Sequence, residues 1–183
     1  MRRQLPVIAS ILLIVAVIAL IYLRDSRNVP EPAPAAQIRV FPQITNTDFR
    51  SVRLMDPSEP QDALVLAWNA STQTWVVPGT NTPPLDQQQV DVLLTVLARM
   101  TFTDSVAPGE GGFASYGLGN DGRFVIEFTT LNGIQHRIKA GNLSDSGTAY
   151  FVRIDELDRV SIVDRERIDY LIATMTQPPL QAA

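Results

Sequence analysis

Residues 124–140 read FVIEFTTLNGIQHRIKA, and this stretch predicts a β-hairpin. Phe124, Ile126 and Phe128 alternate with the residues between them, and positions 134–140 alternate in the same way after the turn. This period of two is typical of strands with one buried face. Between the two runs, Asn132-Gly133 favours a type I′ turn, the strongest short hairpin signal. The stretch therefore predicts two antiparallel strands.

Further strands are expected on both sides of this hairpin. They are predicted at residues 149–154 and 159–163 after it, and at residues 49–55, 63–68 and 74–77 before it. Each is a short apolar run bounded by turn chemistry. Two segments rich in glycine, Gly109–Gly122 and Gly141–Gly147, are predicted to be loops.

Two amphipathic helices complete the predicted domain. The first is expected from Asp86 to about Met100, with Asp86 as the N-cap and Gln89 in the position that closes a capping box. The second is expected to start at Asp164 and to stop before Pro178. The apolar faces are formed by Val90, Leu93, Leu94 and Leu97, and by Ile168, Leu171, Ile172 and Met175. The predicted fold class is α+β.

The entries of these two helices have matching patterns. They read Leu85-Asp86-x-x-x-Val90-Asp91-x-Leu93-Leu94 and Val163-Asp164-x-x-x-Ile168-Asp169-x-Leu171-Ile172. One interpretation is a duplicated strand–strand–strand–helix unit. The other is that any capped amphipathic helix has this pattern, and both interpretations stay open here.

An uncharged apolar run, Leu5–Leu23, precedes the domain. At ~1.5 Å per helical residue it spans roughly 28 Å, close to the thickness of a bilayer core. We expect residues 1–27 to form a single-pass signal anchor with its flanks. Arg2 and Arg3 favour a cytoplasmic N-terminus and an extracytoplasmic domain. A cleaved signal peptide is the alternative, although its apolar core is usually only ~7–15 residues long.

The remaining segments of the chain are assigned from their composition. Residues 28–37 are rich in proline and alanine and are predicted to be a semi-rigid linker. The α+β domain is assigned to residues 38–177, and residues 178–183 form a tail.

Charge and cysteine content exclude several classes of function. Residues 28–183 contain 11 basic and 18 acidic residues, a net charge of −7. This charge argues against nucleic acid as a partner and against a domain lying flat on anionic lipid. The chain has no cysteine, which excludes disulfides and thiolate chemistry, and only one histidine. We therefore expect no metal and no other cofactor.

A family resemblance rests on the order of several pieces along the chain. These are Trp75-Val76-Val77-Pro78, Leu85-Asp86 with Val90 and Leu93-Leu94, Tyr116-Gly117-Leu118, an Asn-Gly hairpin, Gly141 and Tyr150-Phe151-Val152-Arg153. From about Val40 to Met175 this order resembles the family known as domain of unknown function 4340. The resemblance implies an α+β domain behind one membrane helix, associated with ABC-type transport or gliding-motility components of bacterial envelopes. It implies no catalytic residues.

Residues with possible chemistry are few. His136 lies on the apolar face of its predicted strand, so we expect a packed structural histidine. Gly109–Ala114 fits a dinucleotide-binding glycine pattern, but no helix is predicted to follow it, as that mechanism requires. The acidic run Asp155–Asp158 lacks the ligand spacing of a calcium loop and is interpreted as a solvated hairpin tip.

We therefore expect a membrane-tethered, non-enzymatic interaction or accessory module of a bacterial envelope assembly, linked to transport. Its partners would be the lipid bilayer, through residues 5–23, and envelope or transporter proteins. The expected contact surface lies on the two loops and contains Tyr116, Gly117, Leu118, Asn142 and Asp145.

Two other functions are considered. One is an extracytoplasmic domain that binds a small ligand or glycan against Trp75 and Tyr116. A pocket between the sheet and the helix at residues 86–100 would favour it. The other is a hydrolase that uses Ser115 and His136, which requires these two side chains to lie close together.

Overall fold

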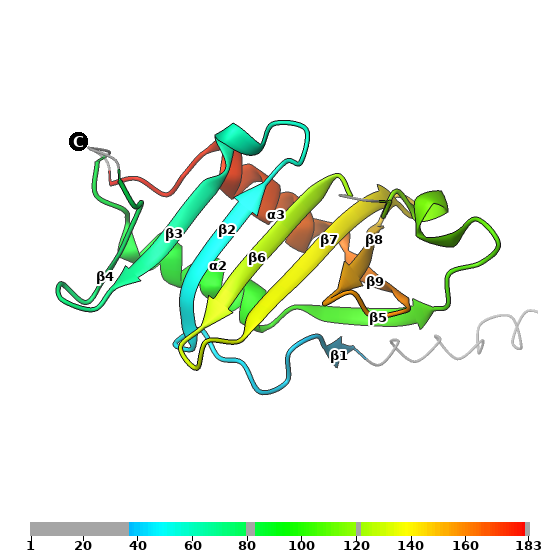
Figure 1. The fold of residues 1–183 in the computed structure, drawn as a ribbon, viewed down its shortest axis with the longest axis horizontal. Coiled ribbons are helices and arrows are strands. Elements are labelled where there is room, and N and C mark those ends of the chain that lie inside the picture. Colours follow the sequence, from blue (N-terminus) through cyan, green and yellow to red (C-terminus); the bar gives the residue numbers. More distant parts are fainter. Residues whose placement is uncertain (1–36, 80–82, 120–121, 182–183) are drawn as a thin grey trace, which may run out of the picture. The chain divides into compact units, whose positions relative to one another are not determined.

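The computed structural model describes residues 37–79, 83–119 and 122–181, and these form an α+β domain (Figure 1). The predicted anchor at Leu5–Leu23 and nearly all of the linker lie outside the described residues. Within the described part of the chain, no helix is both long and apolar enough to cross a membrane.

One antiparallel sheet runs through the described residues, in the strand order β1-β5-β9-β8-β7-β6-β2-β3-β4. The strands are β1 (Ile38–Arg39), β2 (Phe49–Met55), β3 (Leu64–Asn69), β4 (Thr74–Val76), β5 (Thr101–Val106), β6 (Phe124–Thr130), β7 (Gln135–Leu143), β8 (Ala149–Ile154) and β9 (Val160–Asp164). Short 3₁₀ turns form at η1 (Pro60–Asp62) and η2 (Gly112–Tyr116).

Helices α2 (Gln87–Ala98) and α3 (Arg165–Thr176) lie behind this sheet in Figure 1. Their apolar faces pack against the side chains that the strands direct to the same side. On the central strands these side chains are Leu54, Ile126, Ile138 and Val152, all fully buried. The hairpin predicted around Asn132-Gly133 is present and joins β6 to β7. Gly133 has a positive φ of 84° but Asn132 does not, so the turn is not the predicted type I′.

The two helix entries differ in detail. Asp86 caps α2 as predicted, because its carboxylate accepts hydrogen bonds from the backbone N–H groups of Gln88 and Gln89. The reciprocal half of the capping box is not formed, since the Asp86 N–H donates to the carbonyl of Pro179. At α3, Asp164 makes no side-chain cap. The similarity of the two sequences thus does not extend to their capping.

Several elements were not predicted from the sequence. Strand β5 follows α2 directly, and five of its six residues are half-buried, which leaves no clear alternation. Strand β7 continues to Leu143, so the prediction that Gly141–Leu143 belongs to a loop was wrong. The segment Gly109–Gly122 was predicted to be a flexible loop, yet it contains the 3₁₀ turn η2.

Strand β4 lies at one edge of the sheet, and a side chain satisfies its outer backbone groups. Trp75 N donates to Gln87 Oε1 at 2.8 Å, and Gln87 Nε2 donates to Trp75 O at 3.1 Å. The same Nε2 also donates to Leu85 O at 3.1 Å. The Gln87 amide therefore takes the place of a neighbouring strand, which keeps this edge from pairing with another chain.

We expect Gln87→Ala to lower the free energy of unfolding by about 1–2 kcal/mol, because the backbone of Trp75 loses both hydrogen bonds. Denaturant titration of the full chain measures this loss. Gln88→Ala is the matched control, since Gln88 is exposed and contributes only its backbone to the cap. Equal losses from the two variants would contradict the proposed role of Gln87.

Candidate functional site

The two segments predicted as contact loops lie against each other. A Cβ on Gly141 would come within 2.2 Å of the Tyr116 carbonyl oxygen, and one on Gly117 within 2.6 Å of Asn142 Oδ1. The Tyr116 ring also meets Phe151 edge-on, at 4.9 Å between centroids. The η2 segment is thereby fixed to strands β7 and β8.

This contact reduces the exposure of the residues predicted to form a contact surface. Leu118 is only 1 % exposed, so its side chain is not available as a contact surface. Tyr116, Gly117 and Asn142 are half-buried, and Asp145 is exposed. A contact role for this surface stays a prediction.

We expect Gly141→Ala to lower the free energy of unfolding by about 2 kcal/mol, within the range for overpacked sites, because Tyr116 has to move away. Gly109→Ala is the matched control, since Gly109 belongs to the predicted loop that contains Tyr116 and a Cβ there would meet no atom within 4 Å. Thermal and denaturant unfolding of both variants test the contact, and a neutral Gly141→Ala would refute it.

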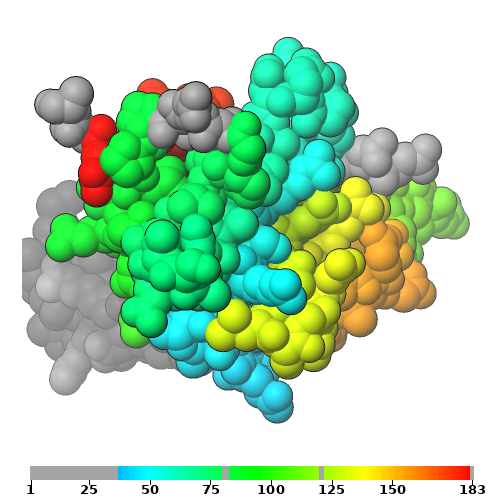
Figure 2. All heavy atoms as spheres, turned by 60° about the vertical axis from the view of Figure 1, so that its left-hand side comes forward, coloured from blue at the N-terminus to red at the C-terminus, as the bar shows by residue number. Residues whose placement is uncertain are grey.

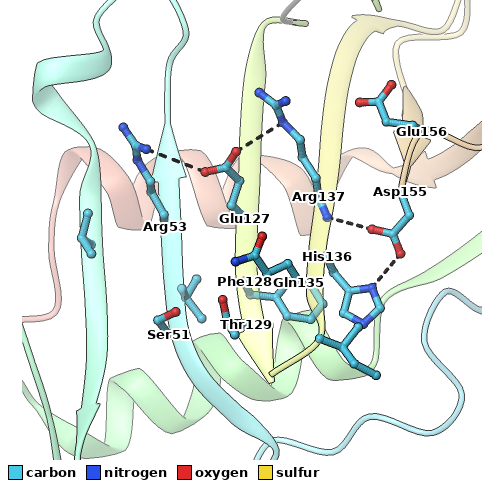
Figure 3. A pocket seen from close by; sticks show the side chains of 13 residues that line it. Ser51, Arg53, Glu127, Phe128, Thr129, Gln135, His136, Arg137, Asp155 and Glu156 are labelled. Carbon is cyan, nitrogen blue, oxygen red and sulfur yellow. Dashed lines mark hydrogen bonds and ion pairs between the residues drawn. The ribbon is translucent and has the colours of Figure 1, made fainter. Parts of the chain in front are cut away.

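The sheet face opposite the helices contains a polar groove of about 730 Å³, which we call the open-face groove (Figure 3). Its centre is the row Arg53, Glu127 and Arg137, one residue each from β2, β6 and β7. Register places Glu127 directly opposite both arginines. The carboxylate of Glu127 lies 3.8 Å from Arg53 Nη1 and 3.3 Å from Arg137 Nε. Ser51, Thr129 and Gln135 add further polar groups.

One end of the open-face groove is formed by the turn after β8. Asp155 and Glu156 both adopt positive φ angles there, 47° and 58°, which is uncommon for residues other than glycine. Asp155 accepts a hydrogen bond from Arg137 N at 2.8 Å and lies 2.6 Å from His136 Nδ1 (Figure 3). The acidic run was interpreted as a solvated tip, whereas two of its carboxylates bind side chains of the sheet.

Glu156 is the partner of a buried lysine. Its carboxylate lies 2.8 Å from Lys139 Nζ and 2.7 Å from Arg153 Nη1, and the Lys139 side chain is only 8 % exposed. The hydrogen bond from Lys139 lowers the pKa of Glu156 below its ordinary value of 4.5, and burial opposes this shift only in part. The ionised form of Glu156 is therefore favoured by the folded state.

A lowered pKa stabilises the fold above the unfolded pKa, near 4.5, and that stability is lost as the pH falls through the folded value. We expect Glu156→Gln to cost about 0.5–1 kcal/mol at pH 7, since Glu156 is half exposed, and less at pH 3. Unfolding free energies at both pH values measure this. Glu59→Gln, at an exposed glutamate, is the control, and an equal cost of Glu156→Gln at both pH values would contradict the assignment.

The hydrolase hypothesis required Ser115 and His136 to lie together, and the structure gives each a different partner. Ser115 Oγ donates to the Gly112 carbonyl within η2. His136 is half-buried and packs on Phe41 and Phe128, with ring centroids at 4.8 and 4.9 Å. His136 is thus a packed histidine, as predicted. In the described ranges, no three metal-ligating side chains gather into a group.

A second hollow, of about 430 Å³, lies between the sheet and α2, and we call it the tryptophan pocket. Its lining residues are Asn46, Thr47, Phe49, Trp68, Gln73, Trp75, Gln87, Asp91, Leu94 and Leu131. Figure 2 brings this side forward, with the β3–β4 hairpin in front and the yellow β6–β7 tip beside the cyan start of β2. A pocket at this helix is the feature that favours ligand binding, although Tyr116 does not line it.

The sequence singled out only part of these surfaces. Trp75 was named, but Trp68 was missed because only the register of β3 and β4 brings the two indoles together. Arg53, Glu127 and Arg137 were missed because they lie far apart in the sequence. The sequence signal available for these three residues was that each occupies a polar position in a strand of alternating pattern.

Comparison with known proteins gives one family. The model of the family described as "Domain of unknown function (DUF4340)" matches residues 75–177, more than half of the chain. The chain belongs to this family. The DUF4340 match runs from Trp75 through α3 and includes Glu127, Arg137 and the Asp155–Glu156 turn. No curated protein and no solved structure matches the chain.

Proposed function

We propose that this protein is a membrane-tethered, non-enzymatic interaction module of a bacterial envelope assembly, linked to transport. Residues 5–23 would hold it in the cytoplasmic membrane, with the N-terminus inside and the domain outside. The uncharged apolar run and the Pro/Ala-rich residues 28–37 support the tether. The association expected for DUF4340 members supports the envelope context.

The observation that carries this proposal is the open-face groove. The helices cover the other face of the sheet, so the row Arg53, Glu127 and Arg137 faces outward (Figure 3). The side chains of Arg53 and Arg137 are 42 % and 38 % exposed, although Nε of each is buried and Arg137 Nε already lies against Glu127. The terminal guanidinium nitrogens are therefore the groups that a partner can reach. A guanidinium presents five donors, and the single carboxylate of Glu127 cannot use those of two arginines.

The groove therefore matches a protein segment that presents carboxylates and backbone carbonyls. Arginine binds such acceptors in a bidentate geometry, which gives specificity as well as affinity. The net charge of −7 on residues 28–183 repels acidic partners from the rest of the domain. Within the groove, the carboxylates of Asp155 and Glu156 already contact His136, Lys139 and Arg153, so an acidic segment would bind at Arg53 and Arg137.

The test is crosslinking of the full chain in its native membrane, with a photoreactive residue at Ser51. We expect capture of an envelope or transporter protein, and a loss of at least about tenfold in the Arg53→Ala/Arg137→Ala variant, because each pairing contributes roughly 1–3 kcal/mol. Arg50→Ala, on the same strand, is the matched control. Capture that is unchanged in the double variant, or capture of no other protein, would overturn the proposal.

A second candidate is an extracytoplasmic domain that binds a small ligand or glycan. The tryptophan pocket supports it, because its apolar walls and few polar groups are typical of ligand sites. Trp68→Ala separates the candidates: it would abolish ligand binding under the second and leave protein capture at the open-face groove unchanged under the first.

A further inference from the structure

We propose that the tryptophan pocket binds a neutral carbohydrate ring, with Trp68 as its platform. This inference rests on the second candidate function and names its ligand class. It does not depend on the open-face groove, which uses different residues on the other face of the sheet.

The two indoles form the apolar wall. Trp68 and Trp75 are direct partners in the register of β3 and β4, and their rings meet edge-on with centroids 6.0 Å apart and planes at 61°. Trp75 is 8 % exposed and belongs to the core, whereas Trp68 is 37 % exposed. The buried ring therefore fixes the exposed one, which offers a rigid apolar surface. The C–H groups on one side of a sugar ring pack on such a surface.

Polar acceptors lie across from this wall. Asn46 Nδ2 donates to Asp91 Oδ1 at 2.7 Å, a contact that links the loop before β2 to α2. This bond uses one oxygen of Asp91 and leaves its second oxygen, together with Asn46 Oδ1, without a partner among the described residues. Both are acceptors, and sugar hydroxyls are donors as well as acceptors.

Of the two glutamines that line the pocket, Gln87 stabilises the fold and Gln73 is available to a ligand. The Gln87 amide is fully occupied by Trp75 and Leu85, so it contributes only to the pocket's shape. Gln73 lies in the β3–β4 turn with a φ of 54°, and its side-chain amide bonds no other described residue. A free amide supplies both a donor and an acceptor, which suits a hydroxyl group.

Charge and size restrict the ligand. No lysine or arginine lines the pocket, and Asp91 is its one charged side chain. Phosphates and carboxylates are therefore disfavoured. A volume of about 430 Å³ is within the usual range of ligand sites, ~300–1,000 Å³, and admits one or two sugar rings. A quaternary ammonium would also suit two indoles and a carboxylate, but the amides at Asn46 and Gln73 favour hydroxyl groups.

The chain contains two tryptophans, and both line this pocket, so intrinsic tryptophan emission reports on it directly. The full chain is placed in vesicles of phosphatidylethanolamine and phosphatidylglycerol, which contain neither sugar nor choline. It is titrated with N-acetylglucosamine, glucose and cellobiose, and separately with choline chloride. We expect a saturable change with at least one sugar, with a Kd on the order of 1 mM for so small a ligand.

Calorimetric titration then tests the assigned residues. We expect Trp68→Ala to weaken sugar binding at least about tenfold and Asp91→Asn by about threefold, whereas Trp68→Phe keeps part of the affinity. Val92→Ala is the matched control, because Val92 is 52 % exposed on α2 and does not line the pocket.

Three results would overturn the proposal: no saturable change with any of the sugars, saturation by choline alone, or equal sugar affinity in Trp68→Ala and the unmodified protein. The variant Arg53→Ala/Arg137→Ala keeps full sugar affinity if the proposal is correct. A failure of partner capture at the open-face groove is therefore distinguishable from a failure of sugar binding.

Discussion

Coverage of one face of the sheet by the two helices is the constraint on which the rest of this structure depends. Helices α2 and α3 cover one side, and strand residues alternate between that side and the opposite face. On β2 and β6, Leu54 and Ile126 are buried under the helices, and their neighbours Arg53 and Glu127 then have to face outward. The open-face groove is thus a direct consequence of how the core is built.

The close approach of η2 to β7 limits the extent of that outward face. Arg153 places its guanidinium 3.9 Å from the centre of the Phe113 ring, and Tyr116 meets Phe151. The η2 segment therefore covers part of β8 and leaves the row Arg53, Glu127 and Arg137 accessible. Gly141 permits this because a larger side chain would occupy the position of the Tyr116 carbonyl.

Local sequence patterns predicted the local structure well. Strand β2 has the predicted bounds Phe49–Met55, and the hairpin at Asn132-Gly133 and the Asp86 cap are confirmed. Strand β5 was missed because both of its faces are half-buried, so its residues show no period of two. Both candidate surfaces depend on strand register, which relates residues as distant as Arg53 and Glu127. No short window of sequence contains that information.

The two surfaces lie on opposite faces of the same sheet but share strand β2. Phe49 belongs to the tryptophan pocket, whereas Arg53 belongs to the open-face groove. The register of β2 against β6 shifts between Phe49 and Ser51, and this irregularity is what turns Phe49 toward α2. Because the helices fill the helix-side face and leave the outward face free, occupation of the pocket would not obstruct the groove. The architecture therefore permits a small ligand and a protein partner to bind at the same time.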